Sequence, residues 1–160
     1  MNESLVDDDF IRKVIDQYSD MILRVSYQYV GNVQDAEDVV QDVLLGLLDY
    51  LSRAEFQSDE HLKAWLIRVA INTSKNVAKA NARRRRREAQ APTGQAQPED
   101  LESVLNELSA IDREVVYLHY FEGYSAKEIG ELIHKTEKSV FKRLSRARTK
   151  MKEFLSEEDR

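Results

Sequence analysis

Cationic side chains near the C-terminus recur at spacings that place them on one side of a helix. At about 100° per residue, this cationic arc contains Lys138, Ser139, Lys142, Arg143, Arg146 and Lys150. The opposite stripe is apolar and contains Val140, Leu144, Ala147 and Met151. Because lysine and arginine hold phosphates and reach base edges, we expect the helix to pack through its apolar stripe and to bind nucleic acid through its cationic arc.

The segments before this helix carry helix start and stop signals. Ser125 followed by Glu128 is a capping box, and Thr136 is an N-cap for the cationic helix. The short interval between the two helices is typical of a helix-turn-helix, whose second helix enters the major groove of DNA. A third helix is predicted to begin at Ser109 and to end near Gly123. A small helical bundle with a solvated basic face is the alternative interpretation.

Charge is segregated along the chain, although the net charge is only −5. Residues 75–88 contain seven basic residues and one acidic residue, and residues 135–152 contain eight basic residues and one acidic residue. Residues 1–60 contain 14 acidic and 4 basic residues. Since phosphate contacts depend on local cations, the two basic segments predict two places where a polyanion binds.

The first basic segment belongs to a long helix predicted from about Glu60 to Arg87. Its buried face is expected to contain Leu62, Trp65, Leu66, Val69, Ala70, Thr73 and Val77. Its polar side carries Arg68, Asn72, Lys75, Asn76 and Lys79, and five arginines follow at 83–87. Amide side chains beside cations suit base edges and phosphates. A disordered charged tail is the other interpretation of the arginine tract.

An acidic amphipathic helix, DAEDVVQDVLLGLLDYL, is predicted from Asp35 onward. Its core face is expected to contain Ala36, Val39, Val40, Val43, Leu44, Leu47, Leu48 and Leu51. The other side carries Asp38, Gln41, Asp42, Leu45 and Asp49. One exposed leucine among acids needs no explanation, but Leu45 also suits the apolar anchor of a docking ridge for a basic partner helix.

Composition and spacing predict an all-α protein of two small domains. The apolar spacing is helical throughout, and residues 89–100 contain both prolines, as expected of a flexible linker. The domains are therefore expected at residues 1–88 and 101–160. No apolar run is long enough to span a membrane, and the acidic N-terminus is unlike a secretory signal, so we expect the chain in the cytoplasm.

The sequence carries no pattern typical of catalytic or metal chemistry. It has no cysteine, and its three histidines, at positions 61, 119 and 134, lack a metal-ligand spacing. It also has no glycine-rich loop that would cradle a phosphate. We therefore expect no metal, no cofactor and no enzymatic activity.

Three runs of the sequence resemble the extracytoplasmic-function, or group IV, sigma factors of bacterial RNA polymerase, which belong to the sigma-70 family. These runs are DAEDVVQDVLLGLL, WLIRVAINTSKN followed by arginines, and LSAIDREVVYLHYFEGYSAKEIGEL with SVFKRLSRAR. The resemblance implies a region 2-like domain, a linker and a region 4-like helix-turn-helix domain. It also implies core RNA polymerase, promoter DNA and an anti-sigma factor as partners.

The resemblance assigns roles to individual residues. Binding to the clamp helices of the largest polymerase subunit is implied for Asp38, Gln41, Asp42 and Leu45. Contact with the −10 element, including capture of a flipped base by Phe56 and Asn72, is implied for Phe56, Asn72, Lys75, Asn76, Lys79, Arg83 and Arg84. Contact with the −35 element is implied for Lys138, Ser139, Lys142, Arg143 and Arg146.

Two places depart from the family pattern. His134 and Lys135 stand in the turn where the family usually has a glycine and an apolar residue, so a left-handed residue is expected there at some cost. Phe141 replaces a residue that is usually polar or basic. It would pack onto a neighbouring helix, contact a thymine methyl group or meet a regulatory protein, and we expect packing.

Two other classes of function fit parts of the sequence. A stand-alone helix-turn-helix regulator would use the same cationic helix, but it would normally dimerise to match two half-sites. An interaction protein would keep the fold without promoter activity. We expect instead a monomer that binds core polymerase.

Overall fold

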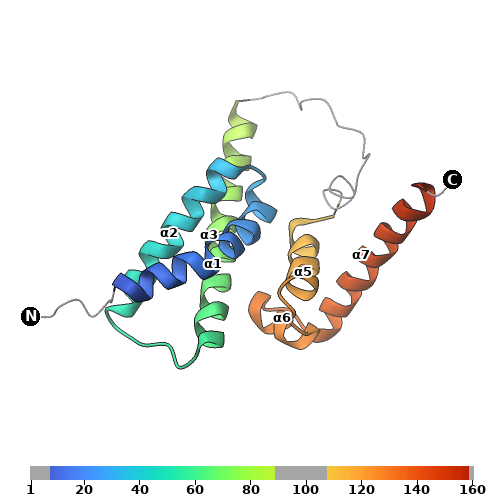
Figure 1. Ribbon diagram of the computed structural model, residues 1–160. Helices are drawn as coiled ribbons and strands as arrows, with labels where there is room; N and C mark the ends of the chain where they lie inside the picture. Colours follow the sequence, from blue (N-terminus) through green and yellow to red (C-terminus); the bar gives the residue numbers. More distant parts are fainter. Residues whose placement is uncertain (1–7, 89–107, 159–160) are drawn as a thin grey trace, which may run out of the picture. The chain divides into compact units, whose positions relative to one another are not determined.

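The computed structural model describes residues 8–88 and 108–158, with residues 154–158 described by their backbone alone. The chain divides into two compact units, residues 1–84 and 85–160 (Figure 1). Every regular element in the described ranges is an α-helix, which confirms the all-α prediction. The predicted linker at 89–100 lies outside the described residues. None of the described helices combines the length and apolar character that crossing a bilayer requires.

The first unit contains α1 (Asp8–Val30), α2 (Val33–Leu51) and all but the last three residues of α3 (Asp59–Arg87). α1 and α2 pack against each other as a helical hairpin. The chain turns between them at Gly31, whose φ of 78° suits a residue without a side chain. Asn32 then caps α2, because its side-chain oxygen accepts a hydrogen bond of 2.8 Å from the amide of Asp35.

α2 and α3 run antiparallel, as contacts near their ends establish. The side-chain amide of Asn81, late in α3, donates a hydrogen bond of 2.9 Å to the carboxylate of Asp35, early in α2. Trp65, early in α3, packs beside Gly46, and its ring centroid lies 5.2 Å from that of Tyr50. The basic end of α3 therefore lies at the start of α2.

The carboxylate of Asp35 helps to hold this end of the unit together. Hydrogen bonds from Asn32 and then Asn81, together with the charge of Arg84, hold the pKa of Asp35 below its usual value. A carboxyl group whose folded-state pKa is depressed adds stability above its unfolded-state pKa, and this stability is lost as the pH falls through the folded-state value. The contribution of Asp35 is therefore present at neutral pH and lost in acid.

The buried face of α2 follows the predicted stripe only in part, since Val40, Leu44 and Leu51 are half-buried and Leu48 is exposed. Its fully buried residues are Ala36, Val39, Val43 and Leu47. Leu48 is 40% exposed, so its predicted place in the core is wrong. At about 100° per residue, Leu48 lies about 100° or more from each fully buried residue of α2, at the outer edge of the predicted stripe.

The buried face of α3 is turned relative to the predicted one. It contains Leu62, Leu66, Ile67, Ala70, Ile71 and Ser74. Of the predicted core residues, the half-buried ones are Trp65, Val69, Thr73 and Val77. Trp65 lies at the edge because its ring packs on the aromatic side chains at the end of α2. Local spacing did not identify Ile67 and Ile71 as core.

The second unit consists of α5 (Ala110–Tyr120), α6 (Ala126–Ile133) and α7 (Glu137–Glu158), which pack on one another (Figure 1). Its core contains Leu108, Val115, Leu118, Ile129, Leu132, Val140, Leu144 and Ala147. The predicted apolar stripe of α7 is confirmed, with Met151 packed against the cluster around Leu108 and Val116. α7 therefore keeps its opposite side available for a partner.

The helix caps of this unit follow the predicted signals. Ser109 accepts a hydrogen bond of 3.1 Å from the amide of Asp112 at the start of α5. Ser125 and Glu128 form the predicted capping box, and these hydrogen bonds hold the pKa of Glu128 below its usual value. Thr136 caps α7 by accepting a hydrogen bond of 3.1 Å from the amide of Ser139.

The turn between α6 and α7 is tight and uses an unusual residue. His134 has φ 59° and ψ 46°, which confirms the left-handed conformation expected at this position. The amide of Lys135 then donates a hydrogen bond of 2.9 Å to the carbonyl of Gly130. A Cβ atom on Gly130 would lie only 2.5 Å from the carbonyl oxygen of Lys135. The turn therefore needs a glycine on α6 rather than at its own left-handed position.

Candidate nucleic-acid and protein interfaces

Four aromatic rings gather at the loop between α2 and α3. Phe56 stacks on Tyr50, with ring centroids 4.7 Å apart and an interplanar angle of 23°. It also meets Trp65 and His61 edge-on, at 5.7 Å and 5.1 Å. Phe56 remains half-buried in this aromatic cluster, so part of its ring is still accessible. Tyr50, Trp65 and His61 were not predicted to belong to a site, although they stand on either side of the loop in the sequence.

The loop itself is fastened to the first turn of α3. The hydroxyl of Ser58 accepts a hydrogen bond of 3.1 Å from the amide of His61, as an N-cap does. The Nδ1 atom of His61 accepts a hydrogen bond of 3.2 Å from the amide of Gln57. These contacts fix the backbone next to Phe56, so the ring is positioned before any ligand arrives.

The amides and several cations of α3 continue the line of the aromatic cluster. At about 100° per residue, Asn72, Asn76 and Arg83 lie within about 20° of the direction of Trp65. Asn72, Asn76, Lys79 and Arg83 are all exposed. The side of α3 that begins at the aromatic cluster is therefore a continuous polar and cationic stripe, which we call the α3 stripe.

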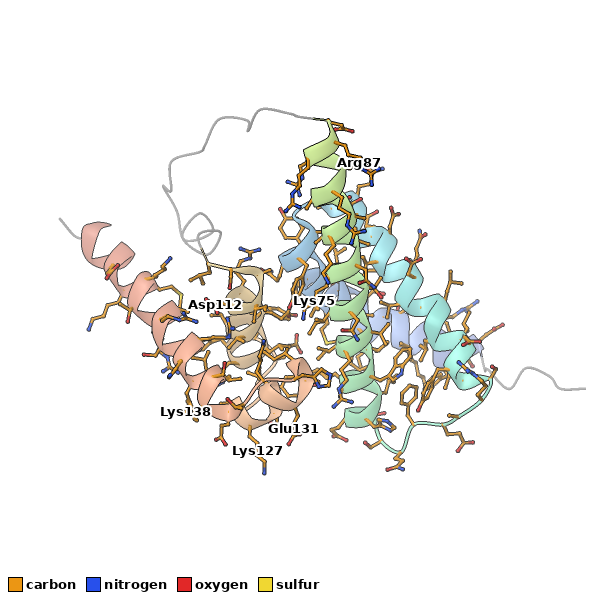
Figure 2. All side chains as sticks on the ribbon, turned by 180° about the vertical axis from the view of Figure 1, so that it is seen from behind. Lys75, Arg87, Asp112, Lys127, Glu131 and Lys138 are labelled. Atoms are coloured by element: carbon orange, nitrogen blue, oxygen red, sulfur yellow. The ribbon has the colours of Figure 1, made fainter. Side chains whose placement is uncertain are left out.

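Two of the predicted −10 residues lie away from the centre of the α3 stripe. Lys75 is half-buried. Arg84 is turned by about 100° from the direction of Trp65, and its charge acts on Asp35. The arginine tract is helical, since α3 continues to Arg87 at its far end (Figure 2). The disordered-tail interpretation of the tract is therefore wrong.

The predicted −35 residues do not share one environment on α7. Lys138, Lys142 and Arg146 are exposed. Ser139, Lys142 and Arg146 line one hollow together with Ser145, which was not predicted to belong to the site. Ser145 falls on the cationic arc by spacing, but its neutral side chain gave no charge signal. Arg143 is different, because only 20% of its side chain is exposed and it forms an ion pair with Asp112.

Phe141 lies on α7 with 54% of its surface exposed. Packing onto a neighbouring helix therefore covers less than half of it, and the expectation that it would pack is wrong. The two surviving interpretations, contact with a thymine methyl group and contact with a regulatory protein, both place its ring at an interface.

The acidic side of α2 is exposed along its length. Asp38, Gln41 and Asp42 are exposed, and Leu45 is 64% exposed. Leu48, one turn further on, adds a second exposed leucine that the sequence analysis had placed in the core. An apolar pair rimmed by carboxylates is a suitable surface for a cationic partner helix. In the described residues, no group of three or more histidines or acids gathers as metal ligands do.

Two family models match the chain in order. The model of sigma-70 region 2 matches residues 14–88, and the model of sigma-70 region 4 matches residues 99–151. The chain belongs to the sigma-70 family. The α3 stripe and the acidic side of α2 fall in region 2, and α7 falls in region 4 up to residue 151. These models together with the curated relatives described next confirm the resemblance to extracytoplasmic-function (ECF) sigma factors.

Curated relatives carry the same family name. The chain is 32% identical to the ECF RNA polymerase sigma factor SigW of Bacillus subtilis over 41% of its length and 34% of SigW. It is 25% identical to the ECF RNA polymerase sigma factor SigE of Mycolicibacterium smegmatis over 90% of its length and 61% of SigE. These matches span less than two thirds of either relative. The match to the RNA polymerase sigma factor SigV of Bacillus subtilis, at 24% identity, covers 85% of both chains.

Two solved structures share the fold. The sigma factor RpoE, in complex with the anti-sigma factor NepR from Bartonella quintana, matches with a TM-score of 0.75 and 24% identity, over 94% of this chain and 98% of RpoE. The structure of CnrH, in complex with the cytosolic domain of CnrY, matches with a TM-score of 0.66 and 22% identity, over 94% of this chain and 90% of CnrH. At these identities the likeness supports the fold.

Proposed function

We propose that this chain is an alternative sigma factor, which binds core RNA polymerase, directs it to specific promoters and helps to open the −10 region. The observation that carries the proposal is the α3 stripe, a line of exposed amides and cations on one side of α3 that begins at the prepositioned aromatic cluster. The polymerase makes the phosphodiester bonds, while this chain selects the start site without catalytic chemistry of its own. It acts in the cytoplasm and is monomeric when free.

Capture of an unpaired base is the physical basis of the proposed opening step. Flipping a base out of a duplex costs a few kcal/mol, and stacking it on an aromatic side chain returns about 1–3 kcal/mol. Phe56 supplies a half-buried aromatic ring, and Asn72 supplies a donor and an acceptor on the side of α3 that begins at the aromatic cluster. Lys79 and Arg83 then hold the phosphates of the strand.

Polymerase binding is assigned to the acidic side of α2. Leu45→Ala is expected to weaken binding to core polymerase by about 30-fold, because a central apolar anchor contributes about 2 kcal/mol or more. Folding should be unchanged, since Leu45 is 64% exposed. The measurement is a titration of the labelled chain with purified core enzyme.

Ile15→Ala is the matched control for Leu45→Ala. Ile15 is also an exposed apolar residue of the first unit, with 38% of its surface exposed. It lies on α1 and not on the acidic side of α2. Binding by this variant should equal that of the parent chain. Equal losses in both variants would assign the effect to general destabilisation rather than to docking.

An anti-sigma factor is proposed as the regulatory partner. The two solved structures named above are complexes with a second protein, and the partner of RpoE, NepR, is an anti-sigma factor. If the chain is fully active in cells from which no partner has been deleted, this part of the proposal fails.

Run-off transcription with core enzyme on fragments of the source genome tests the function as a whole. Transcripts that start at defined sites and depend on this chain are expected. A chain that elutes as a dimer in gel filtration, binds a palindromic duplex and ignores the polymerase would instead be a stand-alone regulator. Polymerase binding without promoter opening would indicate an interaction protein.

A further inference from the structure

One buried carboxylate joins two arginines of the DNA-facing helix. Asp112, on the first turn of α5, accepts a hydrogen bond of 2.6 Å from Nη1 of Arg143. Nη2 of Arg146 lies 3.7 Å from the same oxygen atom. Only 12% of the Asp112 side chain is exposed, against 20% for Arg143 and 64% for Arg146. The carboxylate thus connects the inner and the outer cations of α7.

The position of Asp112 is itself fixed. Its amide donates a hydrogen bond to the hydroxyl of Ser109, which caps α5. A carboxylate in the first turn of a helix is also stabilised by the amide groups that point out of that end. The arginines therefore meet an acceptor whose place is set by α5 and not by α7.

The geometry prevents Arg143 from acting as a base reader. Bidentate contact with guanine requires two guanidinium nitrogens presented outward to the base edge. In Arg143, Nη1 is held by Asp112, and Nε is buried without a hydrogen-bond partner among the residues that the structure describes. Releasing the guanidinium would leave the buried carboxylate of Asp112 with only the longer, more exposed ion pair to Arg146, which is unfavourable.

We propose that Asp112 is a positioning residue for −35 recognition, which holds Arg143 inward as a strut between α5 and α7 and orients Arg146 outward toward DNA. The cations that contact the −35 element are then Lys138, Lys142 and Arg146. This inference rests on the proposed function. It removes Arg143 from the residues expected to contact the −35 element, because Arg143 sets the angle of α7 in the groove without touching DNA.

The salt dependence of DNA binding distinguishes an arginine that joins α5 to α7 from an arginine that contacts DNA. Each cation that neutralises a phosphate adds about 0.9 to the slope of log binding constant against log salt concentration. The full-length chain is first used to select duplexes from a randomised pool. If the parent chain selects no sequence, the proposed −35 reading fails. If it selects one, the same duplex is used to test the variants.

Lys142→Ala should reduce the magnitude of the slope of log binding constant against log salt concentration by about 0.9, the value for one phosphate contact. Arg143→Ala should leave the slope unchanged while broadening the range of selected sequences. Asp112→Asn keeps the shape of the side chain and all cations, and it should likewise broaden the selected sequences without lowering the slope. If a variant were only partly folded, the fraction of protein that binds DNA would fall, but the selected sequences would not change.

Two outcomes would overturn the inference. A fall in slope for Arg143→Ala equal to that for Lys142→Ala would make Arg143 a phosphate contact. An unchanged selected sequence for Asp112→Asn would remove its positioning role. If Arg143→Ala does not fold, the pair variant Asp112→Ala/Arg143→Ala replaces it, since removing both partners leaves no uncompensated buried charge. The same slope and selection criteria then apply to that variant.

Discussion

Phe56→Ala is expected to slow promoter opening by about 5- to 150-fold, because loss of base stacking removes about 1–3 kcal/mol and each 1.4 kcal/mol is a factor of ten. Asn72→Ala should slow it by about fivefold, the value of one hydrogen bond of about 1 kcal/mol. The measurement is the rate of open-complex formation on a linear promoter with core enzyme and saturating variant chain.

The two variants control for each other. Phe56 stacks on Tyr50, so its loss also loosens the loop, whereas Asn72 is exposed and its replacement leaves the fold intact. A template whose −10 region is already unpaired should reduce both defects, since the cost of opening has been removed. Parent-like opening of closed templates by both variants would contradict base capture by the α3 stripe.

Gly130→Ala is expected to destabilise the second unit by about 1–3 kcal/mol, the usual cost of forcing an atom into a packed site. The new Cβ would lie 2.5 Å from the carbonyl oxygen of Lys135 and 3.5 Å from the amide nitrogen of Glu137. Both neighbours are backbone atoms, so the turn before α7 must move. Thermal unfolding followed by circular dichroism measures the loss, and −35 binding should fall with it.

Gly46→Ala is the matched control for Gly130→Ala. Gly46 also lies within a helix, but the nearest atom to its new Cβ would be a ring carbon of Trp65 at an ordinary 3.9 Å. Alanine should therefore stabilise α2 by about 0.5–1 kcal/mol through its better helix propensity. If both alanines destabilise equally, the close approach in the turn is not the cause.

Local signals in the sequence predicted most of the second unit. The three caps at Ser109, Ser125 and Thr136 and the apolar stripe of α7 depend on residues within a few positions of one another. Such contacts form wherever the local sequence allows them. The left-handed His134 could be expected for the same reason, because a turn of this length needs such a residue.

Features that depend on distant partners could not be predicted. Ile67 and Ile71 are buried because α3 is turned about its axis, and spacing fixes the period of a helix face but not its direction. Arg143 has the charge and the helix position expected of a DNA contact. Its guanidinium is nevertheless hydrogen-bonded to Asp112, which lies 31 positions earlier in the sequence. Leu48 shows the reverse case, an apolar residue that its neighbours leave 40% exposed.

The uninterrupted course of α3 has a mechanical consequence. Its 29 residues form one helix from the aromatic cluster to the last arginine. At about 1.5 Å per residue, Asn72 and Arg83 are held about 16 Å apart along the axis. The helix therefore fixes the distance between the captured base and the phosphates that the arginines bind. Inserting or deleting residues in α3 would change this distance and would shift the position at which the two DNA strands separate.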